Sequence, residues 1–176
     1  MSTKFVLGVL TVAAVTAMFA GSAEAQVLAD GEYTFVNDKG DKGWWRVLYV
    51  KIEKVREVDH PQGGKSGVYH VHTNVGWLTA KSSEAGAVVD EEGDDKGTTW
   101  ILHKHSKGWC FVNSQNGANA LSIVGLNPQG GGKASPKEFQ LRRHNAGGNG
   151  MEDQVWQKFD GHVSVDALKA EGIIRQ

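Results

Sequence analysis

The chain contains a single cysteine, Cys110, which excludes an internal disulfide. The hydrophobic core alone must therefore hold the fold together. Cys110 lies between Trp109 and Phe111 in a segment that alternates like a strand. A free cysteine in such a setting behaves as a small hydrophobic residue, so we interpret it as buried filler rather than a nucleophile.

Neither sign of charge is in excess, because 19 Lys and Arg residues face 20 Asp and Glu residues, for a net charge of −1. Such a balance gives no electrostatic footprint for nucleic acid, and we expect no nucleic-acid partner. The sequence also has no Gly-x-Ser-x-Gly, no His-Glu-x-x-His and no phosphate-binding glycine loop. We therefore expect a protein that is not an enzyme and uses no cofactor.

Long apolar runs are absent beyond the N-terminus. Lys4 precedes an apolar segment over residues 5–20, and the small-residue sequence 23–25 (Ala-Glu-Ala) follows it. This order is typical of a secretory signal peptide, so we expect residues 1–25 to be removed and the protein to be secreted, extracellular or, in a bacterium, periplasmic. The alternative is an uncleaved anchor, but the run is short for a membrane span of about 20 residues. We expect no stable membrane span.

Proline is scarce, with three residues, whereas glycine is abundant, with 23. The apolar runs are short, alternate with polar residues and end at Gly, Asn or Asp, which predicts many short strands. The expected strands are 31–37, 44–58 as two strands, 67–73, 77–80, 86–90, 98–104, 108–113, 120–124, 138–143 and 154–159. A short helix is expected near 167–171, capped by Ser164 or Asp166, in a loosely attached tail over 164–176.

One pattern occurs three times: a glycine, an aromatic residue and an alternating strand that runs into Asn. The aromatic residues are Tyr33, Tyr69 and Trp109, spaced by about 36 and then about 40 residues, and we expect them in the core. Three such units, each unable to bury its own apolar face, would close into a threefold barrel without edge strands.

Two segments match a known family motif. Gln154-Val155-Trp156 is followed by Asp160-Gly161, and Thr98-Thr99-Trp100 has the same form with Thr in place of Gln. With the glycine-aromatic repeat, this pattern resembles the β-trefoil of the ricin B-type lectin family over residues 31–163. The resemblance implies an all-β domain over 26–163 with three pseudo-repeats of about 40 residues. The first repeat departs from the pattern, because no Trp occurs near 55–58.

Ricin-type lectins carry an Asp, an aromatic platform and an Asn or Gln in a shallow pocket of each repeat. That order does not occur cleanly in any repeat here, so the candidates are residues near the strand-to-turn junctions. They are Asp38, Asn74, Trp77, Asn113, Asn116 and Asn119. The alternative is that each Asn only shapes a turn. The expected function is non-catalytic binding of carbohydrate or of a glycoprotein.

Two further functions stay open. A trefoil protease inhibitor would bind a protease through exposed loops such as 59–66, 127–136 or 144–152. A metal-binding protein would use two His-x-His pairs, whose members share one face of a strand. The pairs are His70 with His72 and His103 with His105. Four imidazoles from neighbouring strands would suit zinc or copper, whereas the simpler alternative places them on the solvent face.

Adjacent tryptophans at 44 and 45 must point to opposite faces of a strand. We expect one ring in the core. The other is expected to be half exposed, as a sugar or protein contact, or to lie under the tail.

Overall fold

The computed structural model describes residues 27–38, 45–60, 63–74, 76–80, 87–90, 99–105, 107–114, 119–123, 132–133, 139–143 and 154–175. The expected signal peptide, the loop 144–152, most of the loop 127–136, Trp44 and Asn116 lie outside these residues. Within the described part, no helix has the length and apolar character that a membrane span requires.

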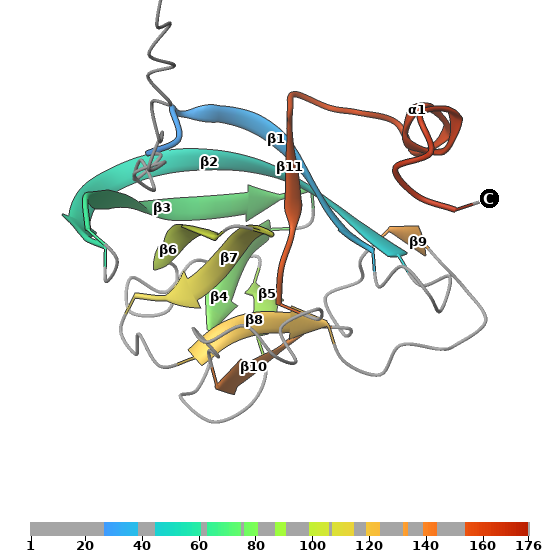
Figure 1. Ribbon diagram of the computed structural model, residues 1–176. Coiled ribbons are helices and arrows are strands. Elements are labelled where there is room, and N and C mark those ends of the chain that lie inside the picture. The colour runs from blue at the N-terminus through green and yellow to red at the C-terminus, as the bar shows by residue number, and fades with distance from the viewer. Residues whose placement is uncertain are drawn as a thin grey trace, which may run out of the picture.

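The described residues form eleven strands and one helix (Figure 1). The elements are β1 Gly31–Asp38, β2 Trp45–Asp59, β3 Lys65–Thr73, β4 Gly76–Ala80, β5 Ala87–Asp90, β6 Thr99–His105, β7 Gly108–Asn113, β8 Asn119–Ile123, β9 Gly132–Lys133, β10 Phe139–Arg143, β11 Gln157–Asp160 and α1 Val165–Ala170. All strand pairs are antiparallel except that of β2 with β9. The expected all-β class is confirmed.

The central strands form a closed ring. Strand β1 pairs with β11 on one side and with β2 on the other, and the ladder continues through β3 and β6 to β7. The ring closes where Trp109 of β7 pairs with Trp156, just before β11, through two N–H to O bonds of 2.7 and 2.8 Å. Closure leaves none of these strands as a free edge of the ring.

Two hairpins branch from the ring. Strands β4 and β5 follow β3, and β8 and β10 pair beside β7. The segments 65–105 and 108–160 therefore each run strand, antiparallel pair, strand, and in the second segment β9 lies between the paired strands and pairs with β2. Strand β2, in contrast, is a single strand of 15 residues and not the two strands expected from the sequence. A register irregularity between Lys54 and Arg56 bends it without ending it.

The ring encloses the main core. It is built by inward-facing side chains of alternating strand positions: Leu28, Tyr33, Phe35, Leu48, Val50, Ile52, Tyr69, Val71, Leu78, Trp100, Leu102, Trp109, Phe111 and Trp156. The repeated aromatics Tyr33, Tyr69 and Trp109 all belong to it, as expected. The Nε1 of Trp100 donates to the Leu78 carbonyl at 2.6 Å, which satisfies a buried polar group.

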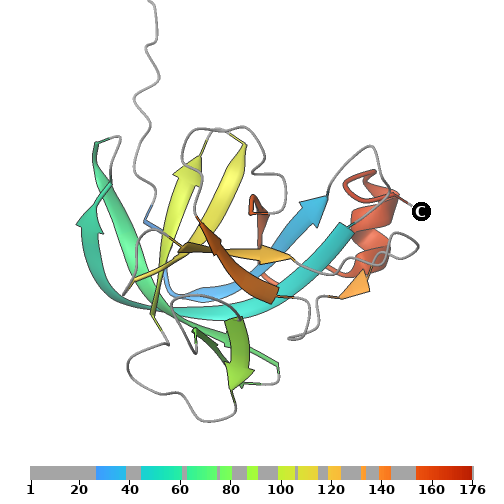
Figure 2. The ribbon, with the colours of Figure 1, turned by 90° about the horizontal axis from the view of Figure 1, so that it is seen from below.

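A second core lies outside the ring, beneath the C-terminal segment. Leu168 of α1 and Ile174 are fully buried there and pack with Val36, Trp45 and Val47 of β1 and β2. Figures 1 and 2 show α1 beside this end of the two strands, far from the β2–β3 hairpin end. The tail is therefore firmly docked, and the expectation of loose attachment was wrong.

Candidate functional site

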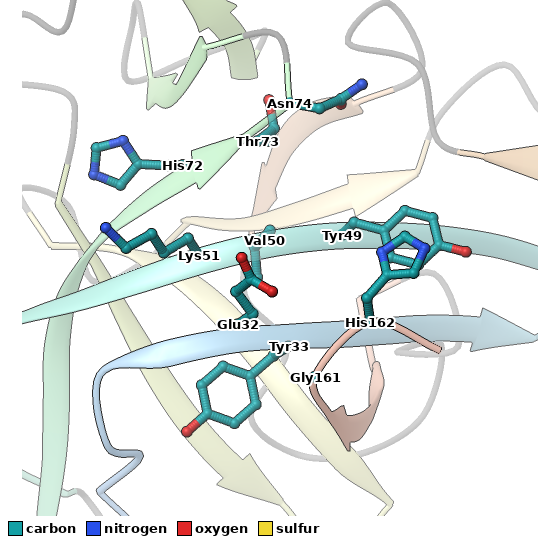
Figure 3. Close-up of a pocket in the computed structure, with 10 residues that line it drawn as sticks. All are labelled: Glu32, Tyr33, Tyr49, Val50, Lys51, His72, Thr73, Asn74, Gly161 and His162. Carbon is teal, nitrogen blue, oxygen red and sulfur yellow. The ribbon is translucent and has the colours of Figure 1, made fainter. Parts of the chain in front are cut away.

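A groove of about 310 Å³ crosses the outer face of β1, β2 and β3 where the tail leaves β11 (Figure 3). Because side chains alternate along a strand, residues between core positions of these strands point outward into it. The groove is lined by Glu32, Tyr33, Tyr49, Val50, Lys51, His72, Thr73, Asn74, Gly161 and His162.

One wall of the groove is aromatic. The rings of Tyr49 and His162 are stacked, with centroids 4.0 Å apart and planes inclined by 20°. Tyr49 is partly buried, and this burial raises the pKa of its phenol, which keeps the group neutral at physiological pH. His162 is exposed, so its outer face is open to a ligand.

The backbone around Gly161 holds His162 in place. The Thr34 hydroxyl donates to the Gly161 carbonyl at 2.7 Å and accepts from the Val163 N–H at 2.9 Å. The Gly161 N–H donates to the Glu32 carbonyl at 2.8 Å. Gly161 has a φ of +69°, which glycine adopts at little cost. The turn is therefore tied to β1 at three points, and it carries His162 over Tyr49.

The rest of the groove is polar. Figure 3 shows Glu32 between the Tyr49–His162 stack and the side chains of Lys51 and His72. The Nζ of Lys51 donates to Glu53 at 2.8 Å, and this bond lowers the pKa of the Glu53 carboxyl and raises the pKa of Lys51. The Glu32 carboxylate makes no hydrogen bond or ion pair with any residue that the structure describes. It is thus an exposed acceptor inside the groove.

A second aromatic group adjoins the groove. The ring of Trp77 in β4 lies 3.9 Å from the ring of His72 and 5.1 Å from that of His70, centroid to centroid. Trp77 is opposite His72 in the β3–β4 pairing, with the exposed Asn74 in the turn between them. Among the sequence-derived sugar candidates, Asn74 and Trp77 thus lie together, and Asn74 lines the groove.

The other sugar candidates lie elsewhere. Asp38 ends β1 opposite Trp45, at the covered end of the ring. Asn113 is buried at the end of β7, opposite Trp100, and offers little surface to a ligand. Asn119 begins β8, and nothing is described of its side chain. Asp38 and Asn113 are not among the residues that line the groove.

The two His-x-His pairs do not converge. His70 is opposite Thr99 in the β3–β6 ladder, whereas His103 contacts Ser66, with 3.0 Å between Nδ1 and Oγ. Ser66 and His70 are four positions apart on β3, or about 13 Å. Across the described ranges, no three His, Cys, Asp or Glu side chains are grouped to hold a metal ion. We therefore do not propose a metal centre built from both pairs.

The loop 59–66 forms the compact end of the β2–β3 hairpin. The His60 N–H donates to the Gly64 carbonyl at 3.0 Å, and the Gly63 N–H donates to the His60 carbonyl at 2.9 Å. The Nζ of Lys65 bonds Asp59 at 2.5 Å across the strand ends. In its described residues the loop is therefore held by internal bonds, with His60 and Ser66 buried and 63–65 exposed.

Five groove residues were not predicted from the sequence: Glu32, Tyr49, Lys51, Thr73 and His162. The available signal was the polar face of the first two strands, because Glu32 and Tyr49 alternate with core residues. Comparison with family models, curated proteins and solved structures found no match for the chain. The functional assignment therefore rests on the groove.

Proposed function

We propose that the protein is a secreted, non-catalytic carbohydrate-binding protein whose sugar site is the groove on β1, β2 and β3. The observation that carries the proposal is the stacked Tyr49–His162 pair beside the free Glu32 carboxylate and the exposed Asn74 amide. Its partner would be a free saccharide or the glycan of a glycoprotein.

These groups match the two faces of a sugar. An aromatic ring packs against the C–H groups of a pyranose, and carboxylate and amide groups hydrogen-bond its neighbouring hydroxyls. The groove volume of about 310 Å³ lies at the small end of the range for ligand sites, roughly 300–1,000 Å³. It therefore suits a short saccharide or a chain end, bound from solvent on a shallow surface.

We also propose that the fold is a β-trefoil of the kind that the sequence resembles. Support comes from the closed ring and from the two segments that run strand, antiparallel pair, strand. In the described residues no hairpin branches between β1 and β2. Under this proposal the first unit is the divergent one, and the groove combines its strands β1 and β2 with β3 of the next unit.

The test is a glycan-array screen of protein purified after expression of the full chain. His162→Ala and Asn74→Ala remove exposed groove side chains, and Lys107→Ala changes an exposed residue in the turn between β6 and β7. We expect binding to one sugar class, weakened about tenfold by His162→Ala, which is roughly 1.4 kcal/mol of binding free energy. Lys107→Ala should bind like the native protein.

A folded protein that binds no glycan on the array would contradict the proposal. Unchanged binding by both groove variants would move the site elsewhere on the molecule. The protease-inhibitor alternative rests on the compact hairpin end at 59–66, and the same purified protein tested against a panel of proteases would reveal it.

A further inference from the structure

We infer that the groove prefers saccharides that carry a free amino group over neutral and acidic ones, with Glu32 as the residue that sets this preference. The inference rests on the proposed function and names the chemical class of its ligand. It follows from the charges that surround the groove.

Glu32 is the groove charge that is left without an ion pair among the described residues. Lys51 is opposite Glu32 in the β1–β2 ladder, but its Nζ bonds Glu53 at 2.8 Å, and Glu32 attracts it only weakly. The acids nearest this end of β1 also have partners. Asp160 bonds the Nζ of Lys158 at 2.6 Å, and Asp30 accepts from the Lys54 N–H at 2.6 Å. A ligand that reaches Glu32 therefore meets a carboxylate without a direct ion pair among the described residues.

A protonated amine is the sugar substituent that best complements this charge. An ammonium group has three donors and no acceptor, whereas an ionised carboxylate only accepts. An ammonium also adds the Coulombic attraction between two full charges, which a hydroxyl donor lacks.

Neutral and acidic saccharides complement the Glu32 carboxylate less well. A neutral sugar donates only uncharged hydroxyl groups to the Glu32 carboxylate. A uronic or sulfated sugar places a second negative charge beside this carboxylate, which is repulsive. Glu32 is exposed, so solvent screening limits the preference. We expect the amino saccharide to bind about fivefold more tightly than its neutral counterpart.

Isothermal titration of the full-chain product tests this with three oligosaccharides of equal length. They are a glucosamine oligomer, the same oligomer fully N-acetylated, and an oligogalacturonate. Tetralysine supplies amines without a sugar ring. The variants are Glu32→Gln and, as the matched control, Glu171→Gln, which changes an exposed carboxylate on the tail outside the groove lining.

The expected order is amino, then neutral, then acidic, with the amino preference lost in Glu32→Gln and kept in Glu171→Gln. Rising salt should reduce the preference, because it screens an exposed charge pair. Equal or tighter binding of the neutral or acidic oligomer, a preference that survives Glu32→Gln, or equally tight binding of tetralysine would each overturn the inference. If the protein binds other glycans but does not prefer the amino oligomer, only this inference is overturned. If it also binds no glycan on the array, the proposed function is overturned as well.

Discussion

Thr34 shows how one buried residue of β1 shapes the groove from below. Its hydroxyl is fully buried and bonds the backbone on both sides of His162. A buried hydroxyl normally requires such partners. The alternating pattern Tyr-Thr-Phe places Thr34 on the face opposite the two aromatic residues. It does not identify the partner, because Gly161 and Val163 are more than 120 positions away along the chain. Contacts of this range decided which residues line the groove.

The histidines also show that long-range neighbours cannot be predicted from the sequence. Alternation correctly predicts that His70 and His72 share a face, and both lie against Trp77. It cannot predict the register of β3 against β6, which places His70 opposite Thr99 rather than beside His103. A change of register moves every cross-strand neighbour, so the sequence alone could not decide between one metal site and two separate pairs.

Cys110 yields a prediction about reactivity. Burial raises the pKa of its thiol from the ordinary 9.0 to about 12, so almost no thiolate forms in the folded protein at neutral pH. We expect it to react with a thiol reagent at pH 8 roughly a thousandfold more slowly than a free thiol, because the thiolate is the nucleophile. Stopped-flow or manual titration with a chromogenic disulfide reagent measures the rate.

The same thiol makes stability depend on pH in the alkaline range. The pKa of the thiol is higher in the folded than in the unfolded state, so its full contribution to stability is present below pH 9 and is lost as the pH rises toward 12.

For the reactivity measurement, protein unfolded in guanidinium serves as the control and should react promptly with one thiol per chain. Equally fast reaction of the folded protein would contradict the buried position.

At the scale of elements, the tail differs most from what its sequence indicates. Ser164 caps α1 as predicted, with its Oγ 3.2 Å from the Ala167 N–H. A helix of six residues has little stability of its own, and this favours an interpretation as a loose tail. Its stability comes instead from packing: Leu168 and Ile174 fill the outer core against Trp45, and the Nζ of Lys169 lies 5.7 Å from that indole ring.

Docking of the tail predicts a large effect of Leu168→Ala. The side chain is fully buried, so its truncation loses apolar burial and leaves a cavity, which costs about 2–4 kcal/mol of unfolding free energy. Urea unfolding followed by tryptophan fluorescence measures the change. Val55→Ala is the control, because that side chain is 47% exposed and its truncation should stay within about 0.5 kcal/mol. A similarly small effect of Leu168→Ala would mean that the tail contributes little.

For the whole molecule, composition and alternation sufficed to predict the all-β class and most strands, because strand formation depends on the local spacing of residues. Closure of the ring does not depend on local spacing. It depends on Trp109 meeting Trp156, two residues that the repeat and the family motif single out but that the sequence does not pair. The glycine before Trp109 belongs to this junction: Gly108 is buried and has a φ of +148°, and a Cβ added there would lie 2.5 Å from the Trp156 carbonyl oxygen.

The closure of the ring can therefore be tested at Gly108. Gly108→Ala forces a methyl group into the backbone that pairs across the junction, where a carbonyl cannot move without losing its 2.7 Å bond from Trp109. We expect a loss of about 2–4 kcal/mol in unfolding free energy, from strain, overpacking and a weakened closing pair together.

Gly172→Ala is the matched control. Its φ is +68°, also in the region that favours glycine, but a Cβ there meets nothing within 4 Å. It should cost about 1 kcal/mol, the backbone term alone. Amide hydrogen exchange at Trp109 and Trp156 gives a second measurement, because opening of the junction should speed exchange there more than in the β1–β2 ladder. If the two glycine substitutions cost the same and exchange at the junction does not change, the Trp109–Trp156 pair does not hold the ring closed, and β1 through β7 act as an open, curved sheet.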